Sequence, residues 1–187
     1  IIPLAVRSIP QPLLGPYPTG FHTLAYYIPN VYEWMRYGVD WWRFTATAPL
    51  FYCILLSARI LGFQMVPFLK VVSPVLHGFL GLAIYGYASK GLDWSRWKSL
   101  FVGLLATLYF TALRVSWDML RLQLGLILLF ASLTLFQSAL KGKRLRSHLF
   151  FSLFAALTVL AHQLSAVIMF ACAAGFTLSR LNRAGIS

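Results

Sequence analysis

The sequence contains very little negative charge: 4 of its 187 residues are Asp or Glu, against 16 Lys or Arg, for a formal net charge of +12. Charged residues of both signs amount to 11% of the chain and hydrophobic residues to 59%, which is too apolar for a soluble domain of this length. This balance indicates a multi-pass integral membrane protein. The basic residues cluster at the ends of apolar runs, where membrane topology accounts for them, so we expect no nucleic-acid partner.

Cysteine is also scarce, and its placement excludes two kinds of site. Cys53 and Cys172 are the only two, and they lie in separate apolar segments. The sequence therefore indicates neither a disulfide framework nor a metal centre, because both need several ligating residues at characteristic spacings.

Apolar runs that suit a bilayer fill the chain after residue 66. A hydrocarbon core about 30 Å thick needs about 20 helical residues. The stretch 147–179 has no Lys, Arg, Asp or Glu over 33 residues, and as one helix it would reach about 50 Å. It therefore fits two short spans with a turn at His162 and Gln163. We predict about five spans, at 67–89, 98–113, 119–140, 147–161 and 164–179.

The first 66 residues have a different pattern, with helix-breaking prolines followed by aromatic residues among polar ones. Segment 21–37 shows this interfacial mixture, and the apolar run 47–62 is short and contains Arg59. We expect an all-α membrane helix bundle in two parts: residues 1–66 form an external loop with interfacial helices, and residues 67–187 form the transmembrane bundle. The opening Ile-Ile-Pro-Leu and the odd number of crossings lead us to expect a piece of a longer chain that lacks a first span.

Basic residues set the expected orientation. They are concentrated at 90–98, 141–146 and 180–183, three places that alternate correctly along the chain if all are cytoplasmic. The external face would then hold the amino-terminal region, the segment 114–121 and the turn at 162–163.

The segment Arg114-Val-Ser-Trp-Asp-Met-Leu-Arg121 is a charged link between two uncharged runs. Charge between two spans is costly unless it lies at a membrane surface or lines a polar cavity, so this link is the first candidate for a functional site. Arg114 and Arg121 suit a lipid phosphate, which a guanidinium binds bidentately. The structural alternatives are that both arginines are interfacial anchors and that Asp118 simply pairs with one of them.

Two histidines lie within the apolar regions. His162, at the turn in the uncharged stretch, needs a polar partner, which is either a functional one or an ordinary surface contact. His77 lies in the middle of a predicted span, and we expect it to hydrogen-bond to a neighbouring helix rather than to a substrate.

Three short motifs occur in order along the chain. They are Ala48-Pro49-Leu50-Phe51-Tyr52 with a trailing Leu61-Gly62-Phe63, then Arg-x-Ser-Trp-Asp-x-x-Arg at 114–121, and then Leu160-Ala161-His162-Gln163-Leu164. Their order and placement resemble the C-type glycosyltransferase superfamily of integral membrane enzymes, which includes protein O-mannosyltransferases, lipid A aminoarabinose transferases and archaeal relatives. The resemblance covers about residues 17–180.

This resemblance implies transfer of a sugar from a polyprenyl-phosphate donor to an acceptor on the external face, in contact with membrane lipid. Such a reaction needs a base that deprotonates the acceptor, and basic or metal groups that stabilise the departing phosphate. No cofactor is implied, and a divalent metal is compatible with the chemistry without being indicated.

In that family the base is usually an acidic residue early in the first external loop, within a motif of the type Gly-Asp-Glu or Gly-Asp-Thr. Here the chain has Gly20-Phe21-His22-Thr23. The candidates are therefore an acid upstream of residue 1, His22, Glu33 or Asp40. By the same resemblance, the catalytic residues include Asp118, and the lipid-phosphate site includes Arg114, Arg121, His162 and Gln163. The missing acid keeps an alternative open, a catalytically inactive scaffold or a transporter subunit of related fold, although the chain shows no inverted repeat typical of transporters.

Overall fold

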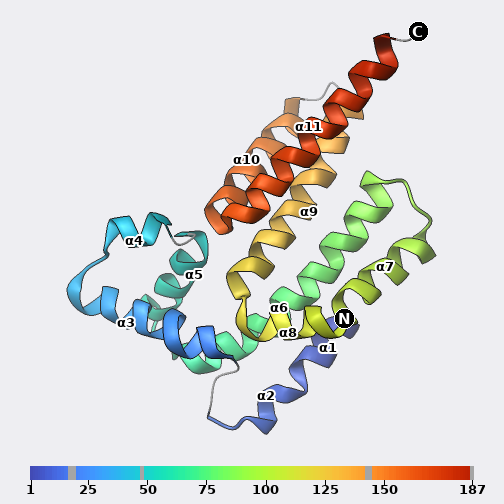
Figure 1. The fold of residues 1–187 in the computed structure, drawn as a ribbon. Helices are drawn as coiled ribbons and strands as arrows, with labels where there is room; N and C mark the ends of the chain where they lie inside the picture. Colours follow the sequence, from blue (N-terminus) through green and yellow to red (C-terminus); the bar gives the residue numbers. More distant parts are fainter. Residues whose placement is uncertain (17–19, 47–48, 142–144, 186–187) are drawn as a thin grey trace.

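The computed structural model describes residues 1–16, 20–46, 49–141 and 145–185, and every regular element in this part of the chain is a helix (Figure 1). The amino-terminal helices are short: α1 (Ile2–Ser8), α2 (Pro10–Leu13), the π-helix η1 (Thr23–Tyr27), α3 (Ile28–Tyr37), α4 (Trp41–Ala46) and α5 (Pro49–Ile60). Longer helices follow: α6 (Met65–Gly86) with its π-helical extension η2 (Tyr87–Gly91), α7 (Arg96–Leu108), α8 (Phe110–Asp118), α9 (Leu120–Lys141), α10 (Leu145–Ala161) and α11 (Gln163–Gly185). The predicted all-α class is confirmed.

Three helices among the described residues are long and apolar enough to cross a membrane: Met65–Gly91, Leu120–Lys141 and Gln163–Arg180. They correspond to the predicted spans 67–89, 119–140 and 164–179. The counterpart of the predicted span 147–161 is α10, which is apolar but shorter. Length and composition thus support three spans, or four if α7 and α8 together form one bent span, and the expected count of about five is not confirmed.

The predicted span 98–113 is not a straight helix. α7 ends at Leu108, Tyr109 has extended backbone angles (φ −62°, ψ 138°), and the helix that follows is bent from α7 by 60°. The hydroxyl of Thr107 donates to the carbonyl oxygen of Gly103 at 2.7 Å, a local bond of the kind that often bends helices. The carbonyl oxygen of Thr107, at the end of α7, accepts a hydrogen bond from a side chain of another helix.

That side chain is His77, which is fully buried on α6. Its Nε2 lies 2.8 Å from the carbonyl oxygen of Thr107, which can only accept, so Nε2 carries the proton. Its Nδ1 accepts from the side-chain amide of Gln123 on α9, at 3.1 Å. His77 thus joins α6, α7 and α9, which confirms the predicted bond to a neighbouring helix.

Replacing His77 with Phe is expected to lower the free energy of unfolding by about 1–2 kcal/mol, because the buried carbonyl of Thr107 and the amide of Gln123 both lose a partner. The matched control is His148→Phe, at an exposed histidine near the start of α10. Unfolding in mixed detergent micelles measures both variants. Equal stability of the two would show that His77 contributes no net bond between helices.

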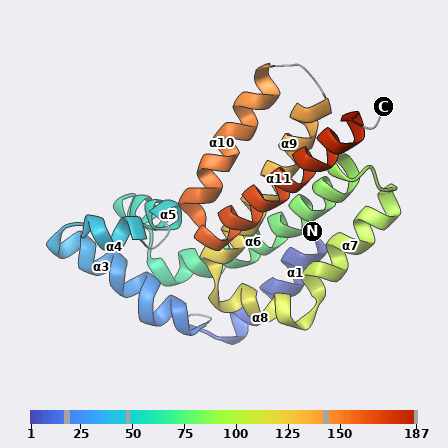
Figure 2. The ribbon, with the colours of Figure 1, turned by 45° about the horizontal axis from the view of Figure 1, so that its top comes forward.

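The central helix of the bundle is α9, which packs against α6, α10 and α11 (Figure 2). α10 and α11 are antiparallel and meet near residue 162. α1 packs against the middle of α6, where two glycines allow a close approach. An added Cβ at Gly78 would lie 3.0 Å from Leu4, and one at Gly81 would lie 3.3 Å from Pro3. The start of the predicted external loop therefore packs along the bundle.

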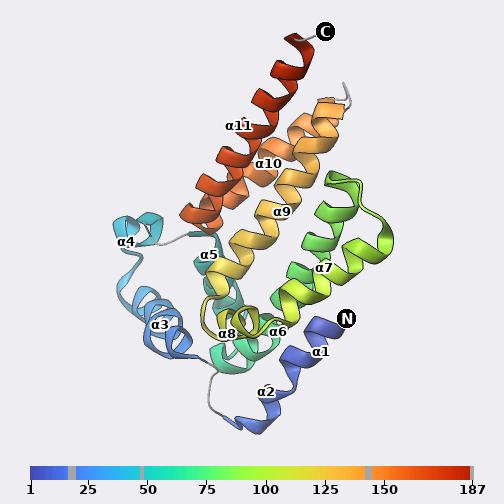
Figure 3. The same ribbon diagram turned by 45° about the vertical axis from the view of Figure 1, so that its right-hand side comes forward.

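The amino-terminal helices have a hydrophobic core of their own, separate from the packing of α9 on α10 and α11. This core, called the second core below, joins these helices to the bundle. Tyr27, Val31 and Trp34 are buried at helical spacing, whereas Tyr32 and Glu33 are exposed. The buried members of this core are Tyr27, Val31, Trp34, Phe51, Tyr52, Leu55, Ala58, Met65, Leu69 and Leu120. In Figure 3, α3 and α4 lie together on one side of the molecule, and α7 lies on the other side.

The predicted basic clusters lie together at one end of the bundle. Lys141 pairs with Asp93 at 2.5 Å, which joins the end of α9 to the connection between α6 and α7. Arg180 of α11 donates to the carbonyl oxygen of Leu140 at 2.6 Å. Residues 142–144 of one predicted cluster lie outside the described residues. The candidate site residues lie toward the opposite end, where α8 meets α9 and α10 meets α11 (Figure 1).

Candidate functional site

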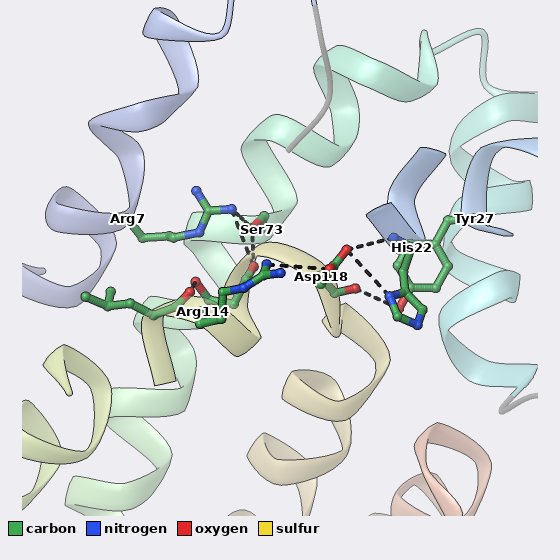
Figure 4. A network of polar contacts seen from close by, with 8 residues as sticks. Arg7, His22, Tyr27, Ser73, Arg114 and Asp118 are labelled. Atoms are coloured by element: carbon green, nitrogen blue, oxygen red, sulfur yellow. Dashed lines mark hydrogen bonds and ion pairs between the residues drawn. The ribbon is translucent and has the colours of Figure 1, made fainter. Parts of the chain in front are cut away.

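The carboxylate of Asp118, the last residue of α8, is the centre of a polar cluster (Figure 4). Its Oδ1 accepts from the backbone N–H of His22 at 2.7 Å and lies 3.5 Å from Nδ1 of the same histidine. Its Oδ2 lies 3.6 Å from Nη1 of Arg114, one turn earlier on α8. The Asp118 side chain is 13% exposed, that of His22 35% and that of Arg114 59%. An enclosed carboxylate thus contacts two groups that reach the surface, and we call these three residues the Asp118 cluster.

Gly20 lets the loop before η1 lie directly on the end of α8. Its φ is +92°, a backbone conformation that glycine adopts readily. An added Cβ would lie 2.2 Å from the carbonyl oxygen of Trp117 and 2.6 Å from Oδ1 of Asp118. Tyr27 adds a hydrogen bond from its hydroxyl to the carbonyl oxygen of Asp118, at 3.3 Å. Segments 96 residues apart, at His22 and Asp118, are therefore in direct contact.

Arg121, in the first turn of α9, is held by aromatic rings. Its guanidinium carbon lies 5.8 Å from the ring centroid of Tyr27 and 5.9 Å from that of Tyr52, distances typical of cation–π contacts. Asn30 donates to the hydroxyl oxygen of Tyr52 at 2.9 Å. Burial raises the pKa of Tyr27 and of Tyr52, with Arg121 acting against it, so both phenols stay protonated at neutral pH. Arg121 is thus a cation at the edge of the second core.

The turn at His162 packs on α9 one helical turn beyond Arg121. Ser165 donates to Nδ1 of His162 from its backbone N–H at 3.4 Å and from its hydroxyl at 3.3 Å. Both residues pack on Gly125, where an added Cβ would lie 2.5 Å from Cβ of His162. Burial, with the charge of Arg121 acting in the same direction, lowers the pKa of His162, so the ring is neutral at pH 7. The predicted break at 161–163 is confirmed, since α10 ends at Ala161 and α11 begins at Gln163.

Gln163, the first residue of α11, contacts the amino-terminal helices. Its side-chain amide donates to the carbonyl oxygen of Ala46, the last residue of α4, at 3.4 Å. Ala48, which opens the predicted motif 48–52, lies outside the described residues. The turn at 162–163 therefore faces the same amino-terminal region that contacts Asp118.

Asp40 and Glu33 make their contacts away from the Asp118 cluster. The carboxylate of Asp40 accepts from the backbone N–H groups of Trp42 and Arg43, both at 3.1 Å, and so caps the first turn of α4. Glu33 pairs with Arg43 at 3.4 Å, and both side chains are about half exposed. Of the predicted catalytic residues, the structure thus brings His22 and Asp118 together, and places Asp40 in the corner between α3 and α4.

Arg7 is a member of this region that the sequence did not single out. It is 1% exposed, and its Nη2 donates to Oγ of Ser73 at 2.8 Å and to the carbonyl oxygen of Ser116 at 3.4 Å. Its guanidinium carbon lies 5.9 Å from the ring centroid of Trp117. Burial lowers the pKa of Arg7 to about 10, which still leaves it protonated at pH 7. The sequence feature that could have identified Arg7 is a single arginine among apolar residues at the start of the chain, because a charge in such surroundings needs polar partners.

The functional groups at this site are a carboxylate, an imidazole and the guanidinium groups of arginines. In the described ranges, no three His, Cys, Asp or Glu side chains form a group that could hold a metal ion. The carboxylate of Asp118, 3.5 Å from Nδ1 of His22, can stabilise by its charge the imidazolium that His22 forms when it acts as a base, and Arg114 and Arg121 can bind an anion.

Comparison of the chain with family models, curated proteins and solved structures found no match to any of them. The described residues themselves define the class: an all-helical chain with three helices of the length and apolarity of membrane spans, and a polar cluster at one end of the bundle.

Proposed function

We propose that the Asp118 cluster transfers a sugar from a polyprenyl-phosphate donor to an acceptor on the external face of a membrane. The observation that carries the proposal is the contact of His22 with Asp118 beside Arg114, because it joins a base, a carboxylate close to its ring and a cation from two distant segments. Arg114 and Asp118 lie in the segment that resembles C-type glycosyltransferases, whereas His22 stands where that family has an acidic residue. The basic clusters at the opposite end fit a cytoplasmic side, which makes the end with Asp118 external.

His22 is the proposed base. Its ring is 35% exposed, and its Nδ1 faces Asp118, so Nε2 is the nitrogen placed to meet an acceptor hydroxyl. In the proposed step, Nε2 takes the hydroxyl proton while the acceptor oxygen bonds to the anomeric carbon of the donor. The bond from that carbon to the phosphate oxygen breaks, and its electron pair leaves with the phosphate. Asp118 stabilises the imidazolium that forms.

The departing polyprenyl phosphate needs positive charge close by. Arg114 is 59% exposed and can bind a phosphate directly through two parallel hydrogen bonds. Arg121 adds its charge from the edge of the second core. In this proposal the neutral imidazole of His162 and the amide of Gln163 contribute hydrogen bonds from the neighbouring turn.

A second candidate is a catalytically inactive scaffold. The chain has four acidic residues, and Glu33, Asp40 and Asp93 make their contacts elsewhere. Asp118 is therefore the acid of this cluster, and it already pairs with Arg114 as a purely structural link would. The scaffold alternative predicts that no lipid phosphate binds here.

Binding of a polyprenyl phosphate tests the proposal at its first step. Purified protein in detergent micelles is expected to bind decaprenyl phosphate, and Arg114→Gln is expected to weaken the binding about tenfold, or about 1.4 kcal/mol, because a charge-assisted hydrogen bond is lost. The matched control is Arg96→Gln, at an exposed arginine at the start of α7, near the opposite end. Thermophoresis measures the three dissociation constants.

Transfer of a labelled hexose from decaprenyl phosphate tests the second step. His22→Gln is expected to keep the affinity for decaprenyl phosphate and to lose transfer. If the wild-type protein binds no decaprenyl phosphate, or if the Arg114 and Arg96 variants bind it equally well, the scaffold alternative is the better account. Unchanged transfer by His22→Gln would remove His22 as the base.

A further inference from the structure

The carboxyl-terminal end of α8 is held by side chains from two distant segments. The last carbonyl groups of a helix have no partner within the helix, and that of Ser116 is one of them. It accepts from the hydroxyl of Ser73 at 2.9 Å and from Nη2 of Arg7 at 3.4 Å. Because Ser73 lies on α6 and Arg7 on α1, three helices meet at one carbonyl oxygen (Figure 4).

Arg7 is costly to keep in this position, since a buried cation is unfavourable unless its N–H groups are hydrogen-bonded. Its side chain and that of Ser73 are 1% and 2% exposed. The guanidinium is placed to contact α8: it donates to the carbonyl of Ser116 and lies over the ring of Trp117. A positive charge is also favourable at the negative end of a helix dipole.

Asp118 follows Ser116 and Trp117 directly and precedes α9, whose first residue, Leu120, is fully buried. Because its side chain is short, the position of the backbone decides where the carboxylate points. It points at the backbone N–H of His22, at 2.7 Å. A shift of the end of α8 by about 1 Å would carry this bond beyond the normal range for hydrogen bonds.

We propose that Arg7 is a positioning residue for Asp118: it holds the end of α8 through Ser116 and Trp117 so that the carboxylate meets His22. Arg7 itself touches no substrate. The inference rests on the proposed function where it concerns catalysis, but its structural step can be tested without any substrate.

Hydrogen exchange of backbone amides tests that structural step in the folded protein. Arg7→Met keeps a long side chain and removes the charge and the donors. We expect the amide of His22, which donates to Asp118, to exchange about tenfold faster, while the amides of α10 exchange as in the wild type. Arg7→Lys, which keeps a charge and a donor, is expected to restore part of the protection. Arg96→Met, at the exposed control position, is expected to change nothing.

Three results would overturn the inference. The first is wild-type exchange at His22 in folded Arg7→Met protein. The second is faster exchange throughout the protein, α10 included, without rescue by Arg7→Lys, because that assigns Arg7 to global stability alone. If Arg7→Met does not fold, Arg7→Gln decides, since it keeps a polar side chain but removes the charge and shortens the reach to the Ser116 carbonyl. Unchanged exchange at His22 in folded Arg7→Gln protein is the third.

Kinetics separate this inference from the proposed function. Arg7→Met is expected to slow hexose transfer about tenfold and to leave the affinity for decaprenyl phosphate unchanged. Added to Asp118→Asn, it is expected to slow transfer no further, whereas additive losses would overturn the positioning role. A wild-type protein that neither binds nor transfers would reject the proposed function, yet loss of His22 protection in Arg7→Met would still support the role of Arg7.

Discussion

Replacing Gly20 with Ala is expected to detach the loop at 20–22 from the end of α8. The new Cβ would lie 2.2 Å from the carbonyl oxygen of Trp117 and 2.6 Å from Oδ1 of Asp118, closer than such atoms come in real structures. The Trp117 oxygen belongs to the backbone and cannot rotate away, so the loop or the helix has to move. Overpacking costs about 1–3 kcal/mol, and an alanine at a φ of +92° adds about 1–2 kcal/mol.

The expected result is a loss of about 2–5 kcal/mol in the free energy of unfolding, together with faster exchange of the His22 amide. Gly38→Ala is the matched control, because Gly38 has a φ of +91° and an added Cβ there would meet nothing within 4 Å. It carries the backbone cost alone, about 1–3 kcal/mol, because φ 91° with ψ 161° is a conformation that essentially only glycine adopts. Unfolding in mixed micelles and amide exchange measure both variants. Equal losses, with His22 still protected in Gly20→Ala, would contradict the close packing of Gly20 on Asp118.

Replacing Gly125 with Ala is expected to push the start of α11 away from α9. The added Cβ would lie 2.5 Å from Cβ of His162 and 2.8 Å from Oγ of Ser165. The hydroxyl of Ser165 can rotate, but Cβ of His162 is fixed to its own backbone, so no rotamer relieves that contact. We expect a loss of about 1–3 kcal/mol in the free energy of unfolding. As the ring of His162 leaves its buried place near Arg121, its pKa is expected to rise toward the ordinary value.

Gly175→Ala is the matched control for this substitution. Gly175 lies within α11, and an added Cβ there would meet nothing within 4 Å. Alanine favours a helix over glycine by up to about 1 kcal/mol, so this variant is expected to be neutral or slightly more stable. Unfolding in mixed micelles and titration of His162 by NMR measure the two variants. A Gly125→Ala protein as stable as Gly175→Ala, with His162 unchanged, would mean that the turn does not pack on α9.

The apolar runs predicted the three candidate membrane spans, Met65–Gly91, Leu120–Lys141 and Gln163–Arg180, to within a few residues. This was possible because the length of an uncharged run is a local property, and a bilayer needs about 20 such residues in a helix. The turn at His162 was predicted in the same way, because the uncharged stretch 147–179 is too long for a single span. The bend at Tyr109 could not be predicted, since it accompanies a bond between Thr107 and His77, which lies 30 residues away on another helix.

At the site, helical spacing predicted that Asp118 pairs with a neighbouring arginine, but it could not decide between Arg114 and Arg121. Asp118 has Arg114 one turn before it and Arg121 one turn after it, and both are neighbours by helical geometry. The structure pairs Asp118 with Arg114, whereas Arg121 lies over Tyr27 and Tyr52. The chain between them decides this outcome: Met119 has non-helical backbone angles (φ −101°, ψ 59°), so Arg121 belongs to α9 and lies against the tyrosines of the second core.

The sequence by itself determined that the chain is helical and apolar, where three of its long helices lie, and that its charge gathers at their ends. These properties depend on neighbouring residues alone. Only the tertiary structure decided which polar groups meet. His22 contacts Asp118 across 96 residues and Arg7 contacts Ser116 across 109, while Asp40, an equal candidate in the sequence, caps its own helix. The physical reason is close packing, since Gly20 and Gly125 bring the distant segments into contact where any larger side chain would hold them apart.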